Sequence, residues 1–153
     1  MSIWRGQVQQ DWVDYNGHLR DAFYMLIFSY AVDGLMDAIG LDAQSRDSTG
    51  MTLFTLEAHV NYLHEVKLHA PIEVRAQIIA MDRKRLQLYL TLHLEGQDQV
   101  MAASEQMLLH VDLSGPRSAP FGEVTQTALE GMMAEQKDWP AAEYAGRRIA
   151  LPR

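Results

Sequence analysis

The sequence predicts an α+β fold in which a curled antiparallel sheet wraps around one long buried helix. Two observations lead to this fold class: an apolar segment of about five helical turns follows the first strand, and four segments with two-residue alternation follow that helix. The composition, 48% hydrophobic and 22% charged residues, is typical of a folded globular chain. We expect one domain over residues 1–153, with its core in about 3–112 and a C-terminal helix and tail in 113–153.

The first strand is expected over residues 3–10, and the Asn16-Gly17 pair marks a turn after it. The long helix follows over 22–39, with Asp21 in the position of an N-cap. Its few polar residues recur every four positions, at Ser29, Asp33 and Asp37. They form one thin stripe, so this helix should be buried on most sides.

Four further strands are expected at 51–62, 72–81, 86–95 and 100–112. The segment 86–95 is the clearest, because five leucines alternate with other residues along it. A hairpin turn is expected at 96–98 and a short surface helix at 123–136. The edge strands of such an open sheet need covering, so we expect a homodimer or a homotetramer.

Charge and composition exclude several function classes. The net charge of −7, from 13 Lys+Arg and 20 Asp+Glu, argues against nucleic acid or an anionic membrane as a partner. No stretch approaches the roughly 20 apolar residues of a membrane span. The absence of cysteine excludes disulfides, thiolate metal sites and a cysteine nucleophile, and the histidines show no metal-binding spacing. We therefore expect a cytoplasmic protein without metal or cofactor.

One loop combines several chemically active side chains directly before the long helix. Asp14, Asn16 and His18 place a carboxylate, an amide and an imidazole at alternate positions around Gly17. The simplest interpretation is an Asn-Gly turn whose polar side chains satisfy local backbone donors. The catalytic interpretation adds the helix start, whose N–H groups and dipole can stabilise an oxyanion. Nearby rings would exclude water from this spot: Trp12, Tyr15, Phe23 and Tyr24.

These groups together suit hydrolysis of an activated acyl group. A thioester fits better than an amide, because a thiolate, from a thiol with a pKa of about 8.5, leaves without strong acid assistance. In this interpretation Asp14 attacks the carbonyl or activates water, while Asn16 and His18 support the reaction.

The Asp-x-Asn-Gly-His loop running into a long apolar helix resembles the hotdog-fold thioesterases of the 4-hydroxybenzoyl-CoA thioesterase group, over about residues 3–112. The resemblance implies that Asp14 is the nucleophile or general base. The related plant-type acyl-ACP thioesterases add a Tyr-x-x-Glu segment, which Tyr62-Leu63-His64-Glu65 matches, so Glu65 joins the catalytic candidates. We expect this segment to face the catalytic loop across a subunit boundary.

Two departures from the family pattern stand out. Many hotdog members have Gly-Asp after the Tyr-x-x-Glu segment, whereas this chain has His69-Ala70, which puts the turn geometry there in question. Arg20-Asp21 replaces the Asn-Asn pair of acyl-ACP thioesterases, which argues against a carrier-protein substrate.

Four segments look like the bacterial carnitine-catabolism thioesterases that act on betainyl-CoA: residues 12–18, 55–59, 108–112 and 117–121. This resemblance implies a small acyl-CoA substrate with a quaternary ammonium group. Such a cation cannot donate a hydrogen bond, so a site holds it by cation–π contact, by negative charge, or by both. We expect the substrate to contact the loop and its rings: Trp12, Tyr15, Gly17, Phe23 and Tyr24.

The densest basic run, at residues 82–85, is either a solvated hairpin or the site for the CoA phosphates, held by Arg83, Lys84 and Arg85. Arg147-Arg148 is the weaker alternative. Glu57, His59 and His93 fall on polar strand faces and are interpreted as solvent or tetramer-interface residues. Two other functions stay open: a non-catalytic acyl-CoA-binding protein, and a hotdog hydratase, whose Asp-x-Asn-Pro-x-His loop has its histidine one position later.

Overall fold

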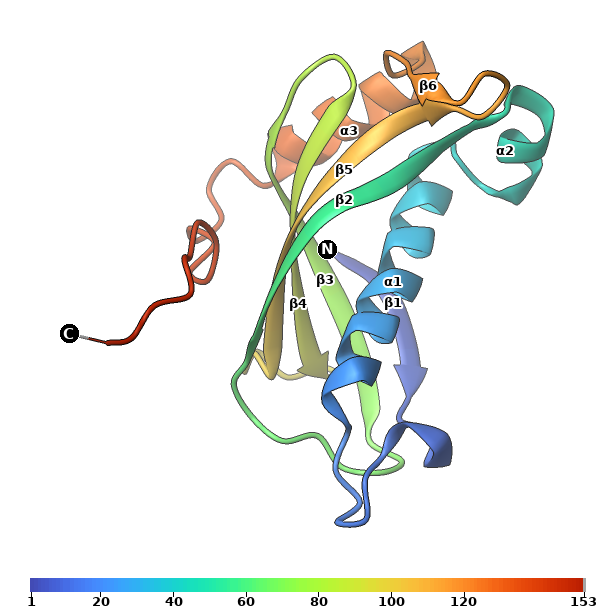
Figure 1. Cartoon of the computed structure of the whole chain (residues 1–153). Coiled ribbons are helices and arrows are strands. Elements are labelled where there is room, and N and C mark those ends of the chain that lie inside the picture. The colour runs from blue at the N-terminus through green and yellow to red at the C-terminus, as the bar shows by residue number, and fades with distance from the viewer. Residues whose placement is uncertain (153) are drawn as a thin grey trace.

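The expected curled sheet around one buried helix is confirmed by a computed structural model that describes residues 1–152 (Figure 1). All strand pairs are antiparallel, in the order β1-β3-β4-β5-β2, with β6 paired to β5. The strands are β1 (Ser2–Gln7), β2 (Met51–Tyr62), β3 (Pro71–Met81), β4 (Arg85–Leu94), β5 (Ala102–Asp112) and β6 (Arg117–Ser118). The helices are η1 (Gln10–Trp12, 3₁₀), α1 (Asp21–Ala38), α2 (Ala43–Thr49) and α3 (Glu123–Glu135).

The helix α1 lies in the concave face of the sheet, because its apolar side chains and the inward leucines of β4 form one hydrophobic cluster. Seven of its residues are buried: Tyr24, Ile27, Phe28, Ala31, Val32, Leu35 and Met36. Gly34 lets the helix approach β1 closely, since a Cβ at this position would collide with the carbonyl oxygen of Ile3. The helix that carries the candidate loop is thus fixed against both the sheet and its first strand.

Two local features differ from the sequence analysis. Arg20, not Asp21, is the N-cap residue of α1, and the Asp21 carboxylate accepts the N–H of Ala22 at 2.8 Å within the first turn. The short helix α2 was not predicted, although Asp42 caps it and Gly50 ends it in the left-handed region, with φ of 73°. No single helix among residues 1–152 is long and apolar enough to cross a membrane; by length and composition only, α1 and α2 together would be, and they are bent by 71° at the break between them.

His93 was predicted to lie on a solvent-facing or interface surface, and this was wrong. Its ring is 3% exposed, because the turn after β4 folds back over the outer face of the sheet. The Arg75 guanidinium holds that turn by donating to the carbonyl oxygen of Gln97 at 2.9 Å. The same guanidinium lies beside Glu73 and lowers the pKa of that carboxyl to about 2. The ion pair between buried Glu73 and half-buried Arg75 therefore takes the place of solvent at this part of the outer face.

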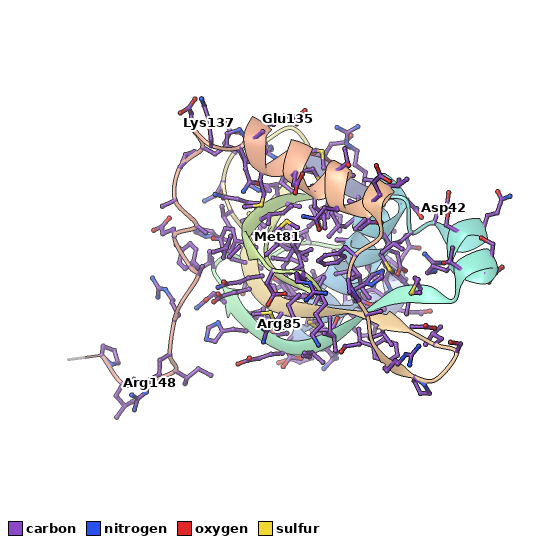
Figure 2. The ribbon with its side chains drawn as sticks, turned by 90° about the horizontal axis from the view of Figure 1, so that it is seen from above. Asp42, Met81, Arg85, Glu135, Lys137 and Arg148 are labelled. Atoms are coloured by element: carbon purple, nitrogen blue, oxygen red, sulfur yellow. The ribbon has the colours of Figure 1, made fainter. Side chains whose placement is uncertain are left out.

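The chain after α3 follows the outside of the curled sheet, from Lys137 to Arg148 in Figure 2. Outer-face side chains hold its backbone: Gln77 donates to the carbonyl oxygen of Pro140 at 3.2 Å, and the Tyr89 hydroxyl accepts from the N–H of Tyr144 at 3.3 Å. The tail thus covers the convex face of the sheet, while the candidate loop lies at one end of the molecule, away from it (Figure 1).

Alanine substitutions at two glycines, one in α1 and one in α3, test the close approach of α1 to β1. Gly34→Ala should lower the free energy of unfolding by about 1–3 kcal/mol, because the new methyl group meets the Ile3 backbone. Gly131→Ala, in α3, has nothing within 4 Å and should raise it by about 0.5–1 kcal/mol through helix propensity. Urea unfolding measures both variants; equal effects would show that α1 does not press on β1.

Candidate active site

The candidate loop is a small hairpin between η1 and α1. Val13 and Leu19 form a β-bridge across it, and the N–H of Asp14 donates to the carbonyl oxygen of His18 at 2.9 Å. The N–H of Gly17 closes the turn on the carbonyl oxygen of Asp14 at 3.0 Å, with a φ of 75° that favours glycine. The Asn-Gly turn predicted from the sequence is confirmed.

The Asp14 carboxylate organises this hairpin from inside. Its Oδ1 accepts the N–H of Asn16 at 2.9 Å and the N–H of His18 at 3.1 Å. The His18 N–H lowers the pKa of Asp14 most, and the Asn16 N–H and the charges of His18 and Arg20 lower it further. Among the described residues, no donor is within hydrogen-bond distance of Oδ2. One carboxylate oxygen therefore shapes the loop and the other is available for chemistry.

The Glu65 segment contacts the candidate loop of its own chain, whereas the sequence analysis expected the two segments to face each other across a subunit boundary. The N–H of Leu19 donates to the carbonyl oxygen of Val66 at 2.7 Å, and His18 Nδ1 lies 3.4 Å from Glu65 Oε2. Val66 and Leu19 are both buried, which fixes the two loops together. Asp14, His18 and Glu65 thus form one continuous group, with Asn16 exposed at the turn.

The chain forms a turn at His69-Ala70, although His69 stands where many family members have glycine. His69 has a φ of 66°, in the left-handed region. Its N–H donates to the carbonyl oxygen of Val8 at 3.1 Å, and the N–H of Ala70 donates to that of Lys67 at 3.2 Å. These hydrogen bonds hold a conformation that L side chains rarely adopt.

The four aromatic residues that were predicted to shield the loop, called here the ring wall, surround it only in part. Trp12 stacks on Phe23, with ring centroids 6.4 Å apart, at the base of the loop. Tyr24 is buried against Tyr62, whereas Tyr15 is 94% exposed and shields nothing within this chain. Sequence reasoning missed Tyr62 as a site residue, although it begins the Tyr-x-x-Glu segment. It also missed Trp4 and Tyr30, which extend the Trp12 stack along α1.

The basic hairpin lies at the opposite end of α1 from the candidate loop (Figure 1). Arg85 is paired with Asp82, whose pKa it lowers to about 2, and Lys84 Nζ donates to Ser118 Oγ at 2.9 Å. Arg83 and Lys84 line a cavity of about 380 Å³ beside Ser118. The alternative basic residue, Arg147, lies over the ring of Tyr144 at 4.8 Å on the outer face. Across residues 1–152, no three His, Asp or Glu side chains are arranged to hold a metal ion.

Comparison with known proteins shows that the chain is similar to thioesterases. The family model of the thioesterase-like superfamily matches residues 8–129. The betainyl-CoA thioesterase of Pseudomonas aeruginosa is 53% identical over 99% of this chain and 96% of its own length. The L-carnitine dehydrogenase/betainyl-CoA thioesterase of Agrobacterium fabrum is 34% identical over all of this chain, which spans 31% of that protein. A Staphylococcus aureus protein crystallised with CoA has a TM-score of 0.90 and 32% identity, over 99% of this chain and 96% of that one.

The two hydrogen bonds to Asp14 predict how its carboxyl group titrates. Because both N–H groups favour the ionised form, the carboxyl carbon should titrate with a midpoint below the ordinary aspartate pKa of 3.8. The amide signals of Asn16 and His18 should follow the same midpoint, since they donate to this carboxylate. NMR titration measures all three, and a midpoint at or above 3.8 would contradict this account of the loop.

Proposed function

Because the chain belongs to the thioesterase-like superfamily, we propose that it hydrolyses betainyl-CoA to glycine betaine and CoA in the cytoplasm. The observation that carries the proposal is the loop geometry: an ionised Asp14 with one free oxygen, beside the His18-Glu65 pair. The hotdog fold and the class of thioester hydrolase follow from the family; the acyl group is the proposed part.

In the proposed reaction, Asp14 Oδ2 attacks the thioester carbonyl carbon and the C–S bond breaks, which forms a mixed anhydride and releases CoA thiolate. Water then hydrolyses the anhydride to glycine betaine and restores the carboxylate. The alternative is that Asp14 deprotonates the attacking water. The lowered pKa of Asp14 keeps the carboxylate ionised, which both routes require.

His18 and Asn16 support this step in the proposal. The His18 ring lies beside the Glu65 carboxylate and can pass a proton to the departing thiolate. The Asn16 side chain, exposed at the turn, can hold the acyl oxygen or a water molecule. The start of α1 contributes less than expected, because the Asp21 carboxylate occupies the N–H of Ala22.

For CoA, the position of the basic hairpin favours a site built from two chains. The 18-residue α1 separates this hairpin from the catalytic loop by about 27 Å along the helix axis. In a two-fold dimer whose β2 strands pair antiparallel, the hairpin of the partner lies near this catalytic loop. We therefore place the CoA phosphates of one active site on Arg83 and Lys84 of the partner, with Arg85 held by Asp82.

The edge strand β2 is the proposed dimer interface. Within residues 1–152 it pairs only with β5, so one edge of this 12-residue strand has backbone hydrogen-bond groups without a strand partner there. Its middle carries exposed apolar side chains, Phe54 and Leu56, next to a bulge between Thr55 and Glu57. Burial of these side chains by a second copy would complete the sheet across the interface.

A charge in the middle of β2 tests this interface. Leu56, 57% exposed, should be buried in the dimer, so Leu56→Glu should produce a monomer at micromolar concentration in sedimentation velocity. Val124→Glu is the matched control, because Val124 is 72% exposed on α3, away from β2, and should leave the dimer intact. A wild-type protein that sediments as an active monomer would refute the interface.

The substrate proposal is tested with an uncharged isostere. 3,3-Dimethylbutyryl-CoA has the shape of betainyl-CoA but carries carbon in place of the quaternary nitrogen. Cation–π and charge contacts of about 1–2 kcal/mol should raise kcat/KM for betainyl-CoA about ten- to thirtyfold above that for the isostere. Thiol release measures both substrates; equal values, or a preference for the isostere, would leave only a general acyl-CoA thioesterase.

A further inference from the structure

Two tyrosines beside the catalytic loop form a fixed aromatic pair. Tyr24, in the first turn of α1, meets Tyr62, the last residue of β2, edge to face, with ring centroids 5.0 Å apart and an 88° angle between the planes. Tyr24 is 4% exposed and Tyr62 is 52% exposed. The pair therefore presents one half-open ring, supported from below by a buried one.

The hydroxyl group of each tyrosine forms a hydrogen bond that fixes its ring. The Tyr62 hydroxyl donates to the carbonyl oxygen of Asp21 at 3.2 Å, and the Tyr24 hydroxyl donates to that of His64 at 3.3 Å. Both hydroxyl hydrogens thus have acceptors within the protein, which fixes the orientation of the two rings. An open, oriented phenol ring offers a negative face to a cation.

Two acidic residues, Asp21 and Glu65, contribute negative charge near the pair. Burial raises the pKa of Tyr62 first, and the charge of Asp21 raises it further; burial and then the charge of Glu65 do the same for Tyr24. Both carboxylates are on exposed residues. Glu65 contacts only the His18 imidazole among the ion pairs within residues 1–152, and Asp21 takes part in none of them.

The chemistry of the acyl group restricts where its cation can bind. In betainyl-CoA one methylene separates the quaternary nitrogen from the carbonyl carbon, a distance of about 2.5 Å. The cation must therefore bind next to the catalytic loop. Glu65 meets this condition, because it lies 3.4 Å from His18, whose N–H donates to Asp14. The Trp4–Tyr30 stack does not, since Tyr30 is two helical turns beyond the first turn of α1, about 10 Å away.

We infer that the ring of Tyr62 and the carboxylate of Glu65 form the subsite for the trimethylammonium group of the acyl substrate. Tyr24 orients the Tyr62 ring, and Asp21 adds negative charge. This inference rests on the proposed function, and it gives Glu65 a role in specificity in place of the catalytic role implied by the family resemblance. It also places specificity on a residue outside the predicted ring wall.

The test compares kcat/KM for betainyl-CoA and 3,3-dimethylbutyryl-CoA in five variants. Tyr62→Leu and Glu65→Gln should each lower the ratio of the two values about five- to tenfold, mainly through KM for betainyl-CoA. Tyr62→Phe keeps the ring and should keep most of the ratio. Trp139→Leu and Glu130→Gln remove an exposed ring on the C-terminal tail and an exposed carboxylate on α3, and both should leave the ratio unchanged.

Each of the other possible outcomes would overturn one part of the proposal. An unchanged ratio in both Tyr62→Leu and Glu65→Gln, with a wild-type preference for betainyl-CoA, would remove this subsite and leave the proposed function standing. A wild type without that preference would remove the proposed substrate itself. Equal losses for both substrates in Glu65→Gln would assign Glu65 to the chemical step. Far-ultraviolet circular dichroism checks that each variant is folded.

Discussion

The rest of the site depends on two hydrogen bonds, which the Asp14 carboxylate accepts from the N–H groups of Asn16 and His18. They turn the chain back on itself, so that Leu19 enters the core and Arg20 caps the start of α1. They also keep the carboxylate ionised, because donors to a charged oxygen lower its pKa. The residue that forms the local turn is therefore also the proposed catalytic group, and the structural and the functional interpretations of this loop are compatible.

The fold holds this loop from two sides. Below it, α1 is buried by the curled sheet and fixed on β1 at Gly34. Beside it, the segment after β2 is attached through the Leu19–Val66 hydrogen bond, which brings Glu65 to His18 and Tyr62 to Tyr24. One protomer thus supplies acid–base, nucleophilic and aromatic groups at a single end of the molecule. The basic hairpin at the other end explains why we propose that CoA binding needs a second chain.

Regular alternation made most of the fold predictable. The leucines of β4 repeat every two residues and are buried between α1 and the sheet, so both the strand and its inner face followed from the pattern. The Asp-x-Asn-Gly-His spacing located the catalytic loop, because turn residues act locally. The features that could not be predicted are contacts between residues far apart in the sequence. His93 alternates like an outward residue, yet the turn after β4 covers it, and nothing in its own strand signals that contact. Glu65 was expected across a subunit boundary, because the pairing of two loops 47 residues apart, such as His18 with Glu65, leaves no periodic signal.

The central claim is that one oxygen of Asp14 folds the loop and the other reacts. Asp14→Asn separates the two roles most directly, because asparagine keeps an oxygen that can accept both N–H groups but loses the charged nucleophile. The amide NMR signals of Asn16 and His18 should stay close to their wild-type positions, while release of CoA from betainyl-CoA falls at least 100-fold. Near wild-type turnover in a variant whose loop signals are unchanged would contradict the account.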